Sequence, residues 1–546
     1  MKKLKSIKNK FIISLAVVFI LTACSESFLD INTDPNNPSD GNLNLIMPAI
    51  QTAYPSAMLR QVNRATAAYV DQIQDYDFGR WQQVESDFNE AWKGFYSQAL
   101  KDIEAIITKA AEEERLAYSG IAKLQKAYIY SILVDLWGDV PYSEAFASNN
   151  PSYDKGEEIY PQLFDLIDEG LAELNQPGSI FSDADMIYRG DKDKWIKMGN
   201  SLKLKMYLQT RLVDEAASAA GINSLINSGN YITSNQDDFQ FQFGTGIAPQ
   251  NAHPRWIDDY NEAGRSGYHS NHMFVKLLGG SERRPDDYEK LSPNVRYGVK
   301  DPRTRYYWFR QVTDMEEGSP SIPCEFNQID CNYFYTGNGY LGRDRGDNSV
   351  GPADVAESTV WGVYPAGGLF DKDESQQVTV NDGTGAGIHP MITNFMMKFY
   401  LAEAALTMNA VDGDPWMYLE EGIRASIGKV MDFGDKTDPP PTEFKPTDED
   451  IDTYVMAVKE KYDAADMEGK LEIIIDQFFV AIYGNGIEAY TSFRRTGYPI
   501  LQPVVDNNEA GPFPLRLVYV VDELGSNKNM PSESLTTNPV FWDINN

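Results

Sequence analysis

The chain has 546 residues, and its 80 acidic residues outnumber its 48 lysines and arginines, which gives a formal net charge of −32. This acidic excess argues against nucleic acid or an anionic lipid surface as the partner, because both require a cationic footprint. Hydrophobic residues make up 42% of the chain and aromatic residues 12%, so the chain can bury a large core and is not disordered as a whole.

The first 24 residues have the features of an exported lipoprotein precursor. A lysine-rich start without acidic residues leads into the apolar run Phe11 to Leu21, which spans only about half of a ~30 Å hydrocarbon core. Leu21-Thr22-Ala23-Cys24 then resembles the lipobox of lipoprotein signal peptides. We therefore expect residues 1–23 to be a signal peptide and Cys24 to carry the palmitate-containing anchor. Removing the signal peptide, with its five lysines, leaves 43 basic and 80 acidic residues, a net charge of −37.

A tether and a first helical segment follow. Residues 24–41 are rich in Pro, Asn and Asp, which predicts an extended, turn-rich tether. From 42 to 230, apolar residues recur at steps of three or four, which predicts the first part of a helical scaffold. The clearest stripes run from Ile121 to Leu136, from Ile159 to Leu174 and from Trp195 to Met206, the last with Asp191 as its N-cap.

The helical periodicity fails between residues 231 and 390. This segment holds many glycines, all four histidines and several aromatic clusters, so it predicts an irregular insertion with a few short strands. One such strand is expected at Val378–Val380, ahead of the glycine-rich loop Gly383–Gly387.

Helical periodicity returns at 391–499, the second part of the scaffold, and an irregular tail covers 500–546. We find no clean 34-residue self-similarity. The periodicity alone therefore supports a mostly α-helical fold, with a solenoid as one possible arrangement. The helices expected here are Met391–Ala410, Trp416–Met431, Asp448–Tyr462 and Met467–Tyr483.

Two cysteines remain once Cys24 is assigned to the lipid. Cys324 and Cys331 lie seven residues apart, and in an oxidising compartment this parity favours a small-loop disulfide. Two free thiols are the alternative, because sequence does not give the Cα separation that a disulfide requires.

Motifs for catalysis, cofactors and metals do not reach their required patterns. The loop Gly383–Gly387 has Ile388 where a dinucleotide fingerprint needs its third glycine, and Gly422–Lys429 has one residue too many for a phosphate-binding loop. His269 and His272 could share a helix face, but two ligands do not make a metal site. We expect no catalytic residue, no cofactor and no metal.

Four segments, read together, resemble the SusD/RagB family of outer-membrane nutrient-binding lipoproteins. They occur in the family's order behind the lipobox, and one departure is Tyr490, where the family usually has tryptophan. The segments are Phe28–Asn36, Leu133–Ala145 with its Gly-Asp-Val-Pro-Tyr end, Gly190 to Leu204 with Lys194-Trp195, and Glu488–Pro499 with its Arg-Arg-Thr-Gly-Tyr-Pro end.

The resemblance implies a tetratricopeptide-like helical-repeat scaffold with a large irregular, loop-rich insertion. It also implies a cell-surface lipoprotein of the outer membrane, held there through its lipid only, that passes a nutrient to a SusC-like TonB-dependent barrel transporter. The cargo would be a glycan, or alternatively a peptide. A tethered glycoside hydrolase and a helical scaffold that binds only protein are rival functions.

Sugars expose flat apolar faces and many hydroxyls, so a glycan site uses aromatic platforms beside Asn, Asp and Arg. Adaptable recognition belongs on loops held by a rigid frame, so we expect the ligand at the insertion, assisted by the turn Asp75–Trp81. Most aromatic residues pack in cores, so only a minority of the candidates should touch ligand. The candidates are Trp81, Trp256, Tyr268, Trp308, Tyr335, Tyr340 and Trp361.

Overall fold

A computed structural model describes residues 42–261, 268–279, 297–313, 339–346, 356–502, 504, 510–531 and 536–545. The signal peptide, the tether, Cys24, Cys324, Cys331 and Tyr335 lie outside these ranges, so the interpretations placed on them stay predictions. Within the described ranges, the longest apolar helices are still too short or too polar to cross a bilayer.

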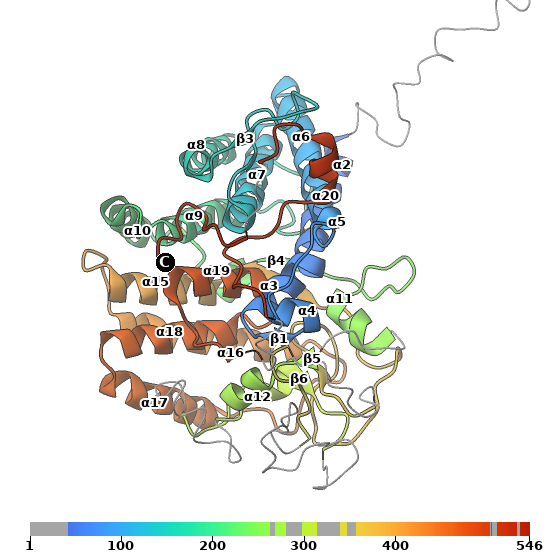
Figure 1. Ribbon diagram of the computed structural model, residues 1–546, viewed down its shortest axis with the longest axis vertical. Coiled ribbons are helices and arrows are strands. Elements are labelled where there is room, and N and C mark those ends of the chain that lie inside the picture. The colour runs from blue at the N-terminus through green and yellow to red at the C-terminus, as the bar shows by residue number, and fades with distance from the viewer. Residues whose placement is uncertain are drawn as a thin grey trace, which may run out of the picture.

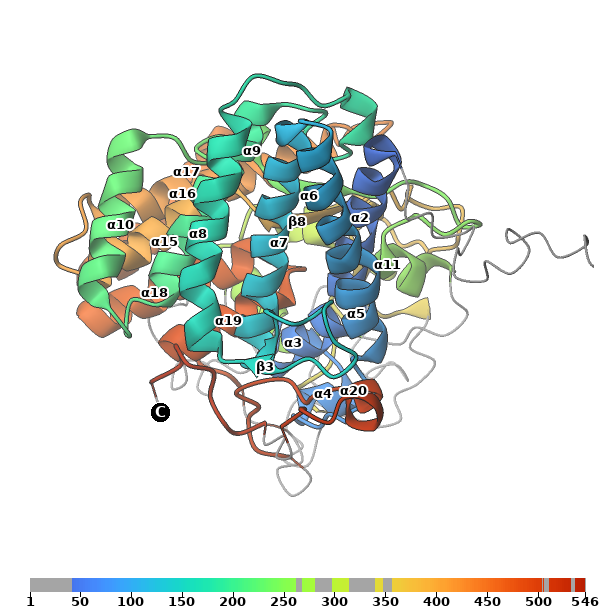
Figure 2. The same cartoon turned by 90° about the horizontal axis from the view of Figure 1, so that it is seen from above.

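The first part of the chain forms a layer of helices that pack side by side (Figures 1 and 2). The long helix α7 lies at its centre and contacts α6, α8 and α9. The helices, with short π-helical and 3₁₀ turns between them, are α2 (Leu43–Ala57), η2 (Met58–Val62), α3 (Asn63–Tyr69), α4 (Tyr76–Gly79), α5 (Asn89–Lys93), η3 (Gly94–Leu100), α6 (Lys101–Glu112), α7 (Leu116–Trp137), α8 (Gly156–Leu174), η4 (Ser182–Ala184), α9 (Lys192–Gln209) and α10 (Glu215–Ser228).

The stripes seen in the sequence explain these helices and are confirmed. Ile121, Leu124 and Ile132 are fully buried on α7, where they face the neighbouring helices. Asp191 caps α9 by accepting bonds from the backbone N–H groups of Asp193 at 3.1 Å and Lys194 at 3.2 Å. Local sequence therefore sets where these helices begin and which face they bury.

The second helical part packs below the first in the view of Figure 1. The four predicted helices are confirmed to within three residues at each end. Thr447 and Asp450 form a capping box at the start of α17, and Gly497, with φ of 78°, ends α19 in the left-handed conformation that glycine tolerates. The helices are α15 (Asn394–Thr407), α16 (Pro415–Gly434), α17 (Asp448–Ala464), α18 (Met467–Ala481) and α19 (Gly486–Thr496). We refer to α2–α10 and α15–α19 together as the helical frame.

Between α10 and α15 lies what we call the loop region, the described residues from 229 to 393. Its elements are short: η5 (Asn235–Asp237), β4 (Phe239–Gln242), α11 (Pro254–Trp256), η6 (Ile257–Asn261), β5 (Tyr268–His269), α12 (Asn271–Leu277), α14 (Thr304–Tyr307), β6 (Trp308–Phe309), β7 (Val360–Trp361) and β8 (Ile388–Ile392). The antiparallel pairs β4–β8 and β6–β7 form inside this region. A third pair joins β5 to β1 (Ile73–Gln74) of the frame.

The strand expected at Val378–Val380 is wrong. The backbone N–H and hydroxyl of Thr379 both donate to the Asp382 carboxylate at 2.8 Å, which closes a turn instead of extending a strand. The strand in this part of the chain is β8, which begins at Ile388, on the far side of the glycine-rich loop.

The described part of the C-terminal tail is held along the end of α7. Leu517 N–H donates to the Leu136 carbonyl at 2.8 Å, and the Trp542 indole donates to Asp135 at 2.9 Å. Arg494 of α19 donates to the Leu515 carbonyl at 2.7 Å and to the Asp135 carbonyl at 2.5 Å. The tail also contains α20 (Val521–Ser526), while β2 (Val140–Pro141) pairs with β3 (Tyr153–Asp154) beside it.

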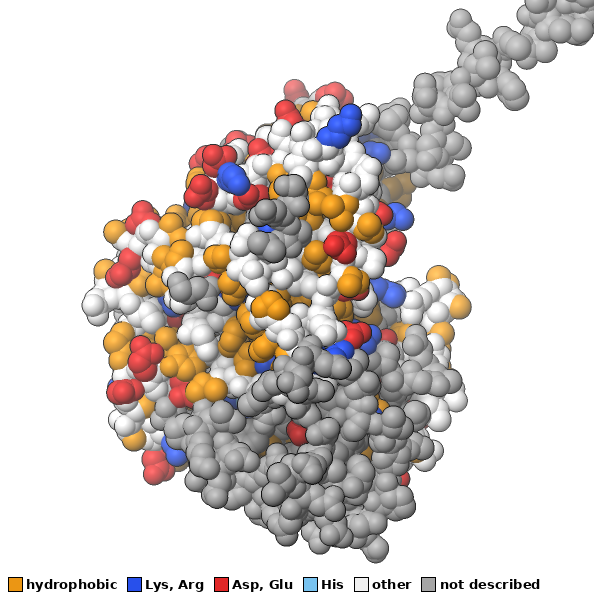
Figure 3. Space-filling view, viewed as in Figure 1, with side chains coloured by type: hydrophobic (Ala, Val, Ile, Leu, Met, Phe, Trp, Pro, Cys, Tyr) orange, Lys and Arg blue, Asp and Glu red, His pale blue; other side chains and the backbone are white. Residues whose placement is uncertain are grey.

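Acidic side chains recur over the outer helices of the frame. Figure 3 shows them over α8 and α10, where lysines and arginines are few. Several frame lysines are already paired with these carboxylates, as Lys123 is with Glu169 and Glu173 at 2.9 and 2.8 Å. The negative charge counted from the sequence is therefore partly a solvated helix surface.

Candidate functional site

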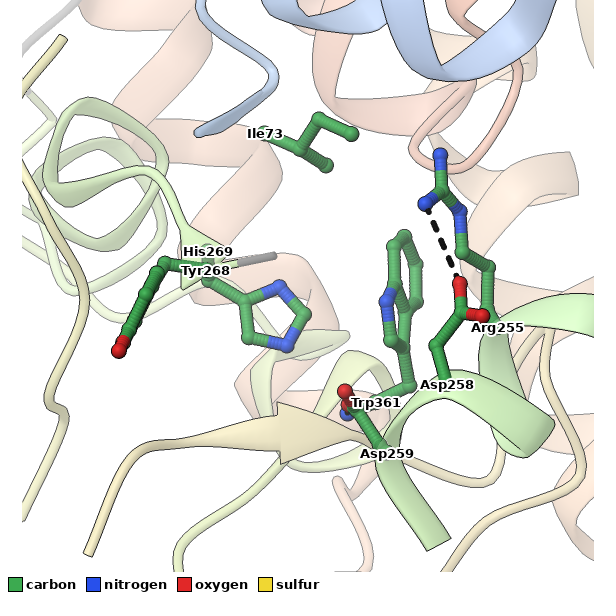
Figure 4. A pocket seen from close by; sticks show the side chains of 7 residues that line it. All are labelled: Ile73, Arg255, Asp258, Asp259, Tyr268, His269 and Trp361. Carbon is green, nitrogen blue, oxygen red and sulfur yellow. Dashed lines mark hydrogen bonds and ion pairs between the residues drawn. The ribbon is translucent and has the colours of Figure 1, made fainter. Parts of the chain in front are cut away.

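A pocket of about 300 Å³, including the solvent space at its mouth, opens where the loop region meets the frame. Because that volume includes open solvent, the space enclosed between the side chains is much smaller, and a ligand would bind mainly at the mouth of the pocket. Figure 4 shows the side chains around it, with Arg255 and Asp258 joined by an ion pair. The lining residues are Ile73, Arg255, Asp258, Asp259, Tyr268, His269 and Trp361.

Three pieces of secondary structure bring these residues together from distant parts of the sequence. The β1–β5 pair sets Ile73 opposite His269. The β6–β7 pair sets Trp361 opposite Trp308. Asp258 and Asp259 follow one another on η6, directly after α11, which carries Arg255. The pocket is therefore a junction of two short sheets and one short helix.

Trp361 forms a rigid wall of the pocket. Its ring stacks on Tyr483 of the frame with centroids 4.8 Å apart and an interplanar angle of 26°. Its backbone N–H donates to the Asp259 carboxylate at 2.8 Å, and its carbonyl accepts a bond from the Tyr260 hydroxyl at 2.8 Å. Only 5% of the residue is exposed, so ligand can reach only a small part of it.

His269 packs edge-on against Trp361, with ring centroids 5.0 Å apart, and is held in one orientation. The Trp308 indole donates to the Tyr483 oxygen at 2.8 Å, which directs the Tyr483 proton toward Nδ1 of His269. Burial, together with the nearby Arg255 charge, lowers the pKa of His269 to about 3. The imidazole is therefore neutral near pH 7 and does not exchange a proton there.

The charged side chains lie on η6 and α11. Nη1 of Arg255 is 3.6 Å from the Asp258 carboxylate, a loose ion pair, and the guanidinium lies 5.9 Å from the Trp361 ring centroid. Burial lowers the pKa of Arg255. Asp258 keeps 32% of its side chain exposed, so one carboxylate at the pocket is open to solvent. The pocket lining therefore contains both a hydrogen-bond donor side chain and acceptor side chains.

Tyr268 is the most accessible aromatic residue of the pocket. It is half-buried, and Arg343 covers its ring at 3.9 Å from the centroid while donating to its hydroxyl at 3.1 Å. The guanidinium orders the ring without burying it, which suits a contact surface for a sugar face.

The other candidate aromatic residues that the structure describes lie away from the pocket opening. Trp81 packs edge-on against Phe513 of the tail and donates its indole N–H to the Tyr69 carbonyl at 3.1 Å. Trp256 stacks on Tyr260 at 5.7 Å and donates to the Asp382 carbonyl. Trp308 and Tyr340 are buried behind the pocket, 6.1 Å apart. The structure thus brings Tyr268 and Trp361 together at the pocket.

Four pocket residues besides the apolar Ile73 were not singled out as binding residues from sequence: Arg255, Asp258, Asp259 and His269. Asp258 and Asp259 are two among 80 acidic residues, so composition gives them no distinction. The one available signal was their place within two or three residues of Trp256 in a segment without helical periodicity. The positions of Ile73 beside His269 and of Trp361 beside Trp308 depend on strand pairing that sequence spacing does not reveal.

The histidines do not form a metal site. His269 lies in strand β5 and His272 in helix α12, so the shared helix face considered from the sequence is wrong. Among the described residues, no group of three His, Cys, Asp or Glu side chains could hold a metal ion.

Comparisons with known proteins agree with this architecture. Residues 35–316, more than half of the chain, match the family described as "Starch-binding associating with outer membrane", and residues 391–536 match "Susd and RagB outer membrane lipoprotein". Among curated proteins, none is similar enough in sequence to count as a relative.

Several solved structures share the fold. A chitin-binding protein is 22% identical with a TM-score of 0.65, and the match covers 91% of this chain and 100% of that one. A SusD/RagB family protein from Bacteroides thetaiotaomicron is 20% identical with a TM-score of 0.65, covering 92% and 99%. A chitin-binding SusD homolog from Flavobacterium johnsoniae is 18% identical with a TM-score of 0.65, also covering 92% and 99%.

The sequence segments, the helical fold and the two family matches therefore lead to one assignment. The tetratricopeptide-like fold expected from the resemblance is confirmed. This chain belongs to the SusD/RagB family of outer-membrane lipoproteins.

Proposed function

We propose that the protein binds a glycan at the pocket between the loop region and the frame, and delivers it to a SusC-like TonB-dependent barrel transporter. The observation that carries the proposal is the wall chemistry: the half-buried ring of Tyr268, the edge of Trp361, the guanidinium of Arg255 and the exposed carboxylate of Asp258 surround one small pocket. Aromatic surfaces beside hydroxyl-binding charged groups are what sugar recognition uses.

The family assignment and two structural neighbours support a glycan as the cargo. One matching family is described as starch-binding, and two structures with the same fold are called chitin-binding. These names describe other proteins at 22% identity or less, so they support the ligand class and leave the particular glycan open.

The first experiment is a glycan array probed beside a peptide pool with the purified mature chain. The proposal predicts binding to at least one oligosaccharide and none to the peptides. Selective peptide binding would support the alternative that the cargo is a peptide.

A second experiment separates binding from hydrolysis. The bound oligosaccharide is incubated with the protein for a day, and new reducing ends are measured. We expect none above a heat-denatured control, because burial lowers the pKa of His269 to about 3, which makes it a weak proton acceptor, and the Asp259 carboxylate already accepts the Trp361 N–H. Accumulating reducing ends would favour the tethered hydrolase.

The transporter partnership is tested by affinity purification from outer membranes. We propose that the transporter docks on the exposed helix faces of the frame, which are regular and rigid, whereas the loop region is irregular. An acylated tagged protein should retain a TonB-dependent barrel through detergent washes. Replacing Cys24 with Ala should abolish palmitate labelling, and persistent labelling would contradict the lipid assignment.

A further inference from the structure

Phe444, in the loop between α16 and α17, is an aromatic side chain that the fold leaves at the surface. It is 49% exposed, more than either Tyr268 or Trp361 at the pocket. Its φ is 56°, in the left-handed region that a bulky residue rarely adopts. Both features are unfavourable for folding, and strained positions of this kind concentrate at functional sites.

A fixed guanidinium lies against the ring of Phe444. The Arg305 guanidinium of α14 is 4.2 Å from the ring centroid, and its Nη1 donates to the Asp371 backbone carbonyl at 3.1 Å and carboxylate at 3.3 Å. It therefore covers one face of the ring and leaves the other face and the edge to solvent. The same arrangement occurs at the pocket, where Arg343 covers the ring of Tyr268 at 3.9 Å.

The loop that carries Phe444 is anchored at both of its ends. Lys445, the next residue, places its Nζ 2.7 and 2.5 Å from the two carboxylate oxygens of Asp435, at the end of α16. Thr447 and Asp450 form the capping box that starts α17. The ring is thus held in place before any ligand arrives, which lowers the ordering cost of binding.

An exposed carboxylate lies next to the Arg305 guanidinium. Asp373 keeps 46% of its side chain exposed, and its Oδ1 is 3.9 Å from Nη2 of Arg305. A hydrogen bond from Arg310 lowers the pKa of Asp373, so the carboxylate is ionised near pH 7 and can accept bonds from hydroxyl groups. An open aromatic face beside charged groups that bond hydroxyls is the chemistry that sugar recognition uses.

We propose that Phe444 and Arg305 form a second glycan-binding surface, separate from the pocket, where the open face of the phenyl ring stacks on a sugar ring. This rests on the proposed function only in that the ligand is a glycan. Neither residue belongs to the lining of the pocket.

The second surface should matter most for long glycans. Two contacts on one polymer raise the apparent affinity above that of either contact alone, provided that the polymer can reach both. A short oligosaccharide held at the pocket gains nothing from Phe444. The expected signature is therefore a loss that depends on the length of the ligand.

The chain offers a matched control. Phe181 of the frame is 64% exposed, and the nearby Arg115 guanidinium stacks on Tyr118 at 4.1 Å, while it lies 5.9 Å from the Phe181 ring centroid. Phe181→Ala therefore removes an exposed phenyl ring that does not have a guanidinium stacked closely on one face.

The test compares two lengths of one glycan. Affinity electrophoresis uses gels that contain the polysaccharide from which the best array oligosaccharide derives, and calorimetry uses that short oligosaccharide itself. Phe444→Ala should bind the polysaccharide at least about fivefold more weakly and the oligosaccharide like wild type. Phe444→Trp, which keeps an aromatic face, and Phe181→Ala should match wild type in both assays. Circular dichroism should show each variant folded.

The outcomes separate this inference from the proposed function. Wild-type retention of Phe444→Ala on the polysaccharide, or an equal loss in Phe181→Ala, would overturn the second surface while glycan binding at the pocket stands. So would a Phe444→Ala variant that keeps the polysaccharide but no longer retains the barrel, because the ring would then contact protein. If wild type binds neither the polysaccharide nor any oligosaccharide, the proposed function fails and the inference falls with it.

Discussion

A buried ion pair of the helical frame and the ion pair at the pocket differ in how closely their charges are held. In the frame, Glu403 of α15 accepts two bonds from Arg495 at 2.8 Å each, and Arg495 also donates to Gln209 at 2.7 Å. At the pocket, Arg255 meets one carboxylate at 3.6 Å and has two nitrogens without described partners. Elsewhere the loop region also pairs its charges closely, as Arg303 does with Asp301 at 2.6 Å. The loose pair is therefore a feature of the pocket, where we propose that it meets a ligand.

Tyr483 connects the two regions. It follows α18 of the frame, yet it stacks on Trp361 and bonds to both Trp308 and His269 of the loop region. A rigid frame residue therefore fixes two walls of the pocket, which lowers the ordering cost of binding. The comparison predicts that substitutions of buried charges in the frame lower stability strongly, whereas substitutions at the pocket mainly weaken ligand binding.

The largest expected effect is in the frame. Glu403→Ala should lower the free energy of unfolding by about 3–5 kcal/mol, because it leaves Arg495 and Arg211 buried without their carboxylate. Chemical denaturation measures it. Asp463→Asn breaks an exposed pair with Lys459 and should change stability by less than about 0.5 kcal/mol. Equal losses of stability in the two variants would show that the buried ion pair contributes no more than the exposed one, and would contradict this account of the frame.

The next effect concerns Asp71, at the junction beside β1. Burial raises the pKa of Asp71 to about 7, although Arg345, Lys276 and the Ser270 hydroxyl favour the charged form and Asp344 opposes it. The native carboxyl therefore holds its proton to a higher pH than the unfolded one, so its contribution to stability falls as pH rises from about 4 to about 7.

Across that pH window, the free energy of unfolding of the wild-type protein should fall by on the order of 3 kcal/mol relative to that of Asp71→Asn, whose side chain does not titrate. Denaturation curves of both proteins at four pH values between 4.5 and 7.5 give the difference. Parallel pH dependences would mean that Asp71 is ionised in the native protein throughout.

The predicted disulfide would cross-link a part of the insertion that lies outside the described residues. A link between Cys324 and Cys331 should contribute about 2–3 kcal/mol by restricting the unfolded chain. The intact mass after alkylation without reductant decides whether it exists: an unlabelled protein supports the link, and two added labels mean free thiols.

A smaller effect is expected at the aromatic junction. Trp308→Phe removes the indole N–H that bonds to Tyr483 and should cost about 1–2 kcal/mol. Tyr483→Phe removes the same bond from its other side, so the double variant should be less destabilised than the sum of the two. Additive losses would show that the bond does not couple the regions.

The sequence predicted the frame well because its signals are local. On α8, the stripe Ile159, Leu163 and Ile167 defines the one buried helix face. Asp191 marks the start of α9 without reference to distant residues. The family segments proved structural where the chain is described: Arg494 holds the tail to α7, and Tyr490 keeps the aromatic packing with Tyr69 and Phe513.

The pocket was only partly predictable because it is assembled from contacts far apart in the chain. Tyr268 and Trp361 were among the candidates, but nothing local distinguishes them from Trp308, which pairs with Trp361 and is fully buried. Ile73 reaches His269 only through the β1–β5 pairing across almost two hundred residues. Such strand pairings cannot be predicted from periodicity and composition.

The most direct test of the account is the affinity of Tyr268→Ala for the best array oligosaccharide, measured by affinity electrophoresis and calorimetry. The control is Trp416→Ala, another partly buried aromatic residue, which packs on Tyr462 in the frame. With both variants folded by circular dichroism, Tyr268→Ala should bind about 5- to 150-fold more weakly, and Trp416→Ala should bind like wild type. Wild-type affinity in Tyr268→Ala would contradict the placement of glycan binding at this pocket.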